Sequence, residues 1–419
     1  MAYPYCFLCK GGKNLCGISP CPLLAGIKRK LPKVEIRGRE IFGSSPPEVF
    51  VGRHNYPNIN IGPLLPPLKE DTSEYVLGSS LWGRPIEDVY AIRSTLIRGK
   101  RPLNVRTPGL DSLRLSSYPV VDEARLKGEV GRTLEGLQEL ALSVRPVDCE
   151  LWLNKVPKNL TPTLNRIEMP FGPSVDFRRF ILAENPRTLR PLERAVHDTD
   201  MKAEDAVWEL YLSGVPLEKI VQLLSVGTLG VGGRRRLVPT RWSITATDDI
   251  LFKKMRDEVA SNPPVDSPIY FYEVYAGNHI HVVLQPGPLQ FEMLEQWQKG
   301  AFWGESRRIL HDYEGVAGRR DYAGEIEGAY YAARLAVAEY LRRTGRCATI
   351  TVIRRITSEY WAPLGVWVIR ETTRRALTKR PLIFSSREDL LKHLERVVRI
   401  PGVLEKSRFL KRSLQTRLF

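Results

Sequence analysis

Residues 268–286 read PIYFYEVYAGNHIHVVLQP. Two runs rich in aromatic and β-branched residues flank Gly277 and Asn278, a pair that favours tight two-residue turns. The stretch therefore predicts a β-hairpin with its turn at Gly277-Asn278. Because side chains alternate between the two faces of a strand, His279 and His281 are expected on the same face.

Two imidazoles on one strand face have the geometry of a metal pair or of an acid-base pair. Asp312, one of several polar residues downstream, could add a carboxylate. One hypothesis is therefore a metal-dependent enzyme that acts on nucleic acid or nucleotides through His279, His281 and Asp312. Nothing in the sequence fixes their convergence, and packing of the histidines into the core is the alternative.

Elements outside the hairpin mix helices and strands. Apolar residues recur at helical intervals in residues 325–344, which end at Gly345, and a β-rich run follows at 348–356. Residues 203–227 predict a helical hairpin, and 386–398 a last helix. This alternation predicts a mixed α+β fold, which we expect to comprise an N-terminal four-cysteine zinc element, two mixed domains and a flexible tail.

Composition describes an ordinary globular protein with a strong basic excess. The 419 residues contain 43% hydrophobic and 26% charged residues, and the formal net charge is +16. No apolar run is long enough to span a bilayer, so we expect no membrane contact and a cytoplasmic location. A basic surface attracts phosphate, which makes DNA the expected partner, although a ribosome or an acidic protein would produce the same signal.

The N-terminal stretch 5–24, YCFLCKGGKNLCGISPCPLL, contains four of the six cysteines. Cys6, Cys9, Cys16 and Cys21 could place four thiolates around one tetrahedral ion, and zinc prefers sulfur at this coordination number. A closed set of four thiolates is a structural site. Two disulfides are the alternative, but they would require an oxidising compartment.

A basic segment follows a glycine-rich run at 227–233. Leu237 to Thr247 is expected to be extended, with Asp248 or Asp249 capping a helix that continues to Val259. The cluster of cations beside an aromatic residue suits phosphate contact and base stacking, so we expect a nucleic-acid interface there. A buried tryptophan beside solvated charges is the alternative. The residues of this cluster are Arg234, Arg235, Arg236, Arg241 and Trp242.

The chain ends in LEKSRFLKRSLQTRLF, residues 404–419. Gln415, Leu418 and Phe419 match the first part of a sliding-clamp binding box, in which an aliphatic and an aromatic side chain fill an apolar pocket. The second aromatic residue of such a box is absent. A plain basic tail is the alternative.

The four-cysteine element, the stretch VPTRWSITATDD and this ending together resemble the archaeal Nre family of DNA repair proteins. The resemblance covers essentially the whole chain. It implies a DNA-damage repair factor that binds DNA and the sliding clamp PCNA, and it supplies no catalytic motif, so the sequence does not decide whether the protein is an enzyme. The expected domains are 1–30 for zinc, 31–233 and 234–402 for the two Nre domains, and 403–419 for the tail.

Overall fold

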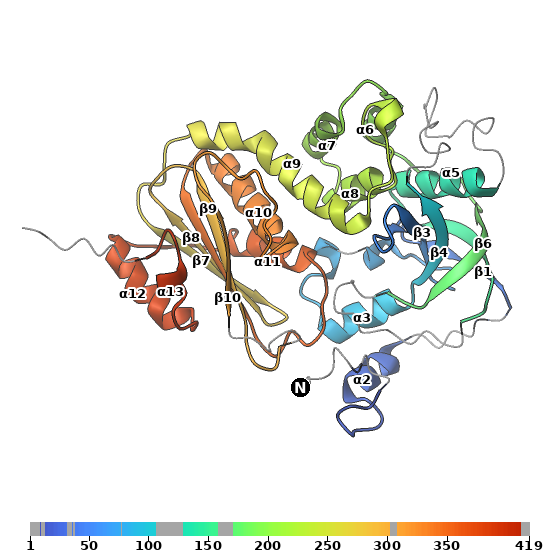
Figure 1. Cartoon of the computed structure of the whole chain (residues 1–419), viewed down its shortest axis with the longest axis horizontal. Helices are drawn as coiled ribbons and strands as arrows, with labels where there is room; N and C mark the ends of the chain where they lie inside the picture. Colours follow the sequence, from blue (N-terminus) through green and yellow to red (C-terminus); the bar gives the residue numbers. More distant parts are fainter. Residues whose placement is uncertain are drawn as a thin grey trace, which may run out of the picture. The chain divides into compact units, whose positions relative to one another are not determined.

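The computed structural model describes residues 9, 13–31, 36, 38–76, 78–105, 129–157, 171–301 and 308–411. This part of the chain divides into two compact units, with boundaries between Ser19 and Pro20 and between Leu251 and Phe252, and the described residues up to Ser19 group with those from Phe252 on. We call residues 20–251 the N-terminal unit and residues 252–411 the C-terminal unit. Each contains one six-stranded sheet together with helices, which confirms the predicted mixed α+β fold class (Figure 1).

The sheet of the N-terminal unit has the strand order β1-β5-β6-β4-β3-β2. Its neighbours pair antiparallel except β4 with β6, which pair parallel. Its elements are α2 (Pro22–Lys30), β1 (Glu40–Ser45), β2 (Val49–Val51), β3 (Asn58–Leu65), α3 (Ile86–Ser94), β4 (Ile97–Asn104), α5 (Glu129–Leu142), β5 (Val147–Leu153), β6 (Ser174–Leu182), α6 (Arg190–His197), α7 (Ala203–Leu212), α8 (Leu217–Ser225) and the short 3-10 helices η1 (Ser73–Tyr75), η2 (Ser79–Leu81) and η3 (Gly232–Arg234).

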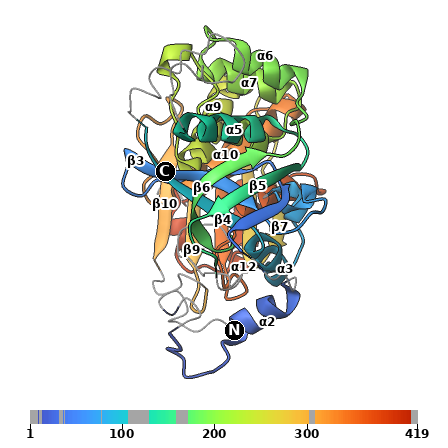
Figure 2. The same cartoon turned by 90° about the vertical axis from the view of Figure 1, so that its right-hand side faces the viewer.

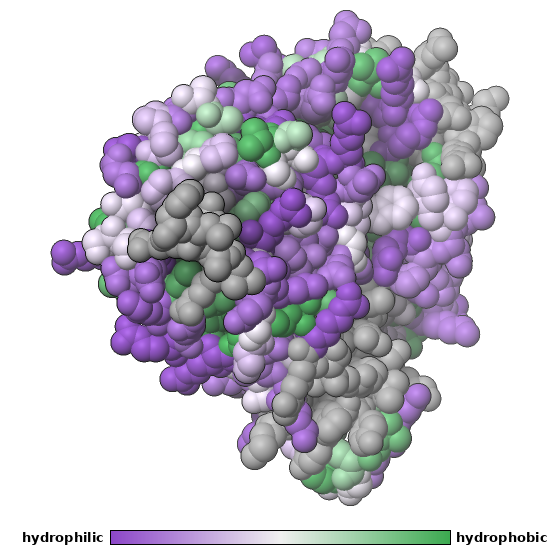
Figure 3. All heavy atoms as spheres, turned by 60° about the vertical axis from the view of Figure 1, so that its left-hand side comes forward, coloured by the Kyte–Doolittle hydropathy of each residue, from purple (hydrophilic) through white to green (hydrophobic). Residues whose placement is uncertain are grey.

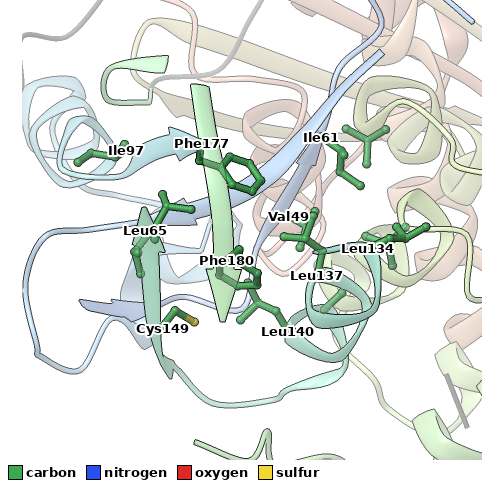
Figure 4. Close-up of a cluster of buried hydrophobic side chains, with 14 of the residues drawn as sticks. Val49, Ile61, Leu65, Ile97, Leu134, Leu137, Leu140, Cys149, Phe177 and Phe180 are labelled. Atoms are coloured by element: carbon green, nitrogen blue, oxygen red, sulfur yellow. The ribbon is translucent and has the colours of Figure 1, made fainter. Parts of the chain in front are cut away.

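The core of the N-terminal unit lies between this sheet and α5 (Figure 2). Burial alternates along β5, as expected for a strand with one covered face. Leu134, Leu137 and Leu140 of α5 are spaced by three residues and are buried against Phe180 and other sheet residues (Figure 4). Each fully buried leucine stabilises the fold by about 2 kcal/mol, so this face determines where α5 lies.

The sheet of the C-terminal unit has the order β10-β9-β11-β8-β7-β12, and its neighbours pair antiparallel except β9 with β11. Helices α10 and α11 cover one face of this sheet, and α12 and α13 cover the other (Figure 1). The elements are α9 (Thr240–Ser261, which begins in the N-terminal unit), β7 (Ile269–Tyr275), β8 (Asn278–Gln285), β9 (Gln290–Trp297), β10 (Ile309–Glu314), α10 (Gly328–Thr344), β11 (Thr349–Ile356), α11 (Trp367–Ala376), β12 (Leu382–Ile383), α12 (Arg387–Val397) and α13 (Val403–Lys406).

The predicted hairpin is confirmed as β7 and β8, but its turn lies one residue earlier than expected. Tyr275 pairs with Asn278, so Ala276 and Gly277 form the turn, with φ of 49° and 74°. Both central residues of such a turn need positive φ. The Asn278 side chain instead donates to the carbonyl of Tyr275 at 3.1 Å and closes the strand end.

The expected extended segment 237–247 was wrong, because α9 already begins at Thr240. The β-branched residues of this stretch favour a strand, but tertiary contacts prevail over that propensity. The Thr240 Oγ1 accepts a hydrogen bond from the Val51 amide at 2.9 Å, and Asp248 is buried inside the helix instead of capping it.

No helix in the described part of the chain is long and apolar enough to cross a membrane. The face of the molecule shown in Figure 3 is mostly hydrophilic, with only small, separate hydrophobic groups.

Candidate nucleic-acid interface

An exposed pair of aromatic rings is the most distinctive surface feature of the N-terminal unit. Tyr56 lies in the loop between β2 and β3, and Trp242 lies in the first turn of α9. Their ring centroids are 5.2 Å apart and their planes are inclined by 51°. Tyr56 is 43% exposed and Trp242 is 44% exposed, so much of the apolar ring surface faces water. We call this pair the aromatic platform.

Backbone hydrogen bonds fix both sides of the platform. The amide of Trp242 donates to the Pro239 carbonyl at 2.8 Å, and Thr240 is joined to β2 through Val51. In the loop, the Asn58 amide donates to the Asn55 carbonyl at 2.7 Å, and Asn55 adopts the left-handed conformation that asparagine tolerates. The two rings are therefore held by ordered backbone on each side.

Two arginines lie close to the platform in the chain, and a third is exposed in the segment before α9. Arg53 lies in the same loop as Tyr56, Arg241 directly precedes Trp242, and Arg234 is exposed in the short helix η3. Cations beside exposed rings are the combination that recognises a nucleic-acid strand, since the cations attract phosphates and the rings stack on bases. Of the predicted interface residues, Arg234, Arg241 and Trp242 are at least partly exposed, as that role requires.

Arg235 is a correction to the predicted interface, because its side chain is buried at 2% exposure. Its guanidinium donates to the carbonyls of Gly230 at 2.6 Å, Val196 at 2.8 Å and Asp198 at 2.7 Å. Burial lowers its pKa to about 10, which leaves it charged at neutral pH. Arg235 thus fastens the glycine-rich loop to the end of α6, and it is not available to DNA.

Arg236 differs again from both of its neighbours. It is half-buried, and its guanidinium donates to the carbonyls of Arg235 at 2.7 Å and Gly233 at 3.2 Å. These bonds orient the side chain along its own loop.

The structure confirms that His279 and His281 share one face of β8. Their Nδ1 atoms form hydrogen bonds with Tyr272 Oη at 2.6 Å and Tyr270 Oη at 2.8 Å. His281 is buried.

Asp312 is not brought to these histidines. His281 aligns across β11 and β9 with His311, so the next residue of β10, Asp312, points to the opposite face of the sheet. Its carboxylate accepts hydrogen bonds from the amides of Glu325 at 3.0 Å and Ile326 at 2.8 Å. The described residues contain no group of three or more His, Cys, Asp or Glu side chains that could hold a metal.

The predicted zinc ligands are only partly described. Cys9, Cys16 and Cys21 belong to no metal-binding group among the described residues, and Cys6 lies outside those residues. The four-cysteine zinc site therefore stays a prediction.

The predicted clamp-binding residues Gln415, Leu418 and Phe419 also lie outside the described residues. The segment just before them is held by Glu292, a buried carboxylate of β9 that the sequence analysis missed. It accepts hydrogen bonds from the Arg408 amide at 2.8 Å, the Phe409 amide at 3.2 Å and the hydroxyl of Ser407.

Tyr56 and Arg53 were missed as well, because each stands in a proline- and asparagine-rich loop with no periodic pattern. No local signal joins them to Trp242, which lies far away in the sequence.

Two family models match this chain. The model described as archaeal Nre, N-terminal, matches residues 15–304, and the model described as archaeal Nre, C-terminal, matches residues 314–419. The chain belongs to the archaeal Nre family. The N-terminal match includes the whole aromatic platform, and the C-terminal match includes the segment held by Glu292 and the tail beyond it.

Curated relatives of this Nre chain agree with the match. It is 34% identical over 418 residues to a DNA repair protein NreB of Archaeoglobus fulgidus, with 99% of both chains covered. It is 36% identical to a DNA repair protein NreA of the same organism, with 92% of both covered. A DNA repair protein NreA of Haloferax volcanii is 36% identical, with 81% of this chain and 79% of the relative covered. No solved structure matches the chain.

Proposed function

We propose that this Nre chain is a DNA-damage repair factor that binds DNA through the aromatic platform and the arginines beside it. The observation that carries the proposal is the exposed Tyr56–Trp242 pair, fixed by backbone hydrogen bonds, with Arg53 and Arg241 close by in the chain and Arg234 exposed before α9. Stacking of one base on an aromatic ring contributes about 1–3 kcal/mol and tolerates any sequence. The net charge of +16 supplies the long-range attraction to phosphate.

The repair role rests on the relatives, since all three are named DNA repair proteins and two of them align with more than nine-tenths of this chain. Binding to exposed bases suits such a role, because damaged and partly unwound DNA offers unpaired bases that an intact duplex does not.

We also propose PCNA as a partner, bound through Gln415, Leu418 and Phe419. The anchoring of residues 407–410 to Glu292 supports this, because a fixed starting point leaves only the last few residues to carry a short recognition motif. A structural zinc held by the four N-terminal cysteines completes the proposal.

Fluorescence anisotropy with labelled single-stranded and duplex DNA tests the platform. Trp242→Ala and Tyr56→Ala should each weaken single-strand binding by about 10-fold, which is the loss of one stacked base. Arg234→Ala should weaken binding to all sequences alike and lower the slope of log affinity against log salt by about one.

Arg179→Ala provides the matched control. Arg179 packs over the Trp152 ring at 5.0 Å within the same unit, but on strands β5 and β6 in the middle of the sheet and not at its β2 edge. Unchanged binding by the platform variants, or a larger loss in Arg179→Ala, would move the DNA contact away from Tyr56 and Trp242.

A further inference from the structure

A cluster of hydrogen-bond donors surrounds His279 in the C-terminal unit, and the proposed contacts with DNA and with the clamp do not use it. Tyr272 Oη lies 2.6 Å from His279 Nδ1, and the rings of Tyr272 and His281 are 4.9 Å apart. Behind them, Tyr270 bonds to His281 and packs edge-on against His393 of α12, with 4.8 Å between the ring centroids. Tyr272 and His279 are half-buried, so solutes can reach them.

Two arginines face this histidine. Arg355 of β11 is the direct cross-strand neighbour of His279, a position that places their Cβ atoms about 5 Å apart. Arg399 is exposed in the loop after α12 and adopts a left-handed backbone conformation, with φ of 56°. Burial, followed by the charges of Arg355 and Arg399, lowers the pKa of His279 to about 4. The imidazole is therefore neutral at physiological pH.

The cluster is rich in donors that lack acceptors. Within the described residues, neither Arg355 nor Arg399 forms an ion pair, and the Arg355 Nε is buried without a hydrogen-bond partner. The same holds for Nε2 of His281, a side chain that is 1% exposed. A buried donor without an acceptor is costly, so these atoms indicate a missing acceptor.

The nearby carboxylates among the described residues do not supply it. The charge of Glu273 raises the pKa of Tyr272. Glu273 forms an ion pair with Lys379 at 2.8 Å, however, and its side chain points to the opposite face of β7. Glu359 is exposed in the loop after β11, and its charge raises the pKa values of Tyr272 and Arg355.

The tautomers of the two neutral imidazoles decide whether their Nε2 atoms are further hydrogen-bond donors. If each tyrosine hydroxyl donates to Nδ1, the proton of the neutral imidazole is on Nε2 in both His279 and His281. The cluster then offers imidazole N–H groups beside two guanidinium groups. Arginines repel a metal cation, whereas this set of donors suits an anion with several oxygens.

We propose that Tyr272, His279, Arg355 and Arg399 form a binding site for a phosphate group, with His281 behind it. The phosphate belongs either to the end of a nucleic-acid strand or to a free nucleotide, which present the same chemistry. This site is separate from the aromatic platform and does not depend on it.

Calorimetric titration of the full-length protein tests the proposal with three probes. These are inorganic phosphate, a nucleoside monophosphate, and a short oligonucleotide with either a 5′-phosphate or a 5′-hydroxyl group. The wild type should bind inorganic phosphate, and Arg399→Gln and Arg355→Met should each weaken that binding at least 10-fold. A preference for the 5′-phosphorylated oligonucleotide identifies a strand end as the ligand, and tighter binding of the monophosphate identifies a nucleotide.

Matched controls separate binding from folding. Arg346→Gln removes another arginine of the same unit, one that pairs with Asp266 at 3.0 Å, and should leave phosphate binding unchanged. Arg399 is exposed, so its variant should unfold at the wild-type temperature even if Arg355→Met does not. The absence of phosphate binding by the wild type, or equal affinity in Arg399→Gln and the wild type, would overturn the proposed site.

Discussion

Three consecutive arginines, 234, 235 and 236, have three different environments. Arg234 is exposed, Arg235 is buried on three carbonyls, and Arg236 bonds within its own loop. The residue type sets the charge, but the backbone around it decides whether that charge meets solvent or protein. A run of arginines therefore predicts a basic surface only in part.

Arg235→Ala should destabilise the N-terminal unit by about 3 kcal/mol, because two buried carbonyls and one part-buried carbonyl lose a charged donor. Urea unfolding followed by circular dichroism measures this loss. Arg234→Ala is the control and should change the free energy of unfolding by less than about 0.5 kcal/mol, since exposed substitutions have small effects. Equal stability of the two variants would mean that the Arg235 contacts do not support the fold.

The four N-terminal cysteines give a second prediction for single residues. We expect about one zinc ion per chain, and loss of that ion when Cys9 or Cys16 is changed to Ser, since three thiolates hold zinc less well than four. Atomic absorption on protein purified under reducing conditions measures the metal content. Cys149→Ser removes a buried thiol that is far from this element in the sequence and should leave the zinc bound. Protein without zinc, with the four cysteines oxidised, would exclude the structural site.

At the scale of elements, patterns within one stretch were predicted well and pairings between distant stretches were not. The predicted helix that ends at Gly345 and the predicted strand that ends at Ile356 were confirmed, because helical periodicity and β-branched runs are local signals. The sequence could not show that Trp242 contacts Tyr56, or that the Glu292 carboxylate accepts hydrogen bonds from the amides of Arg408 and Phe409. Such contacts depend on how strands are ordered in a sheet, which no single stretch encodes.

The turn between β7 and β8 illustrates how one glycine fixes an element. A Cβ at Gly277, where φ is 74°, would lie 2.8 Å from the amide nitrogen of Tyr360 and 2.7 Å from the Thr357 hydroxyl. Gly277→Ala should therefore destabilise the C-terminal unit by about 2–3 kcal/mol, combining the cost of positive φ with this close approach.

Gly402→Ala is the matched control, because Gly402 has φ of 77° and open space around its Cβ position. The Gly402→Ala variant should lose only about 1 kcal/mol of unfolding free energy, which is the cost of the positive φ alone. Thermal unfolding of both variants separates the two contributions. Equal losses would show that the turn does not press against the loop at Thr357.

Glu292 offers a test of how the C-terminal segment is attached. Burial would raise the pKa of its carboxyl, but hydrogen bonds from His311, Ser407 and Thr351 outweigh burial and lower it. Glu292→Gln removes the charge and part of the acceptor capacity. The free energy needed to detach residues 407–410 should therefore fall by about 2 kcal/mol. Hydrogen exchange of the Arg408 and Phe409 amides should accelerate accordingly. Glu405→Gln, on the exposed side of α13, should leave both amides protected.

On the scale of the whole molecule, the proposed contacts are distributed over distant parts of the chain. The aromatic platform belongs to the N-terminal unit, and the proposed clamp motif follows the last anchored residues of the C-terminal unit. A protein that holds DNA at one site and a clamp encircling that DNA at another gains affinity from the high local concentration of the second partner. Each contact alone can then be weak.

This arrangement predicts that the two contacts reinforce each other on clamp-loaded DNA. Deleting the last five residues should abolish binding to free clamp in calorimetric titration, because the two apolar anchors carry most of the binding energy. Folding and binding to bare DNA should be unchanged. On DNA that carries the clamp, the same deletion should weaken binding by about 100-fold, the usual size of the effect of local concentration. Trp242→Ala should weaken binding to clamp-loaded DNA by about the same 10-fold as binding to bare DNA, and its loss should multiply with that of the deletion, because the tail contributes the same local-concentration factor in both backgrounds. Equal affinity of the deletion variant and the wild type for clamp-loaded DNA would mean that the platform and the tail do not act on the same assembly, and equal clamp binding with and without the tail would place the clamp contact elsewhere on the chain.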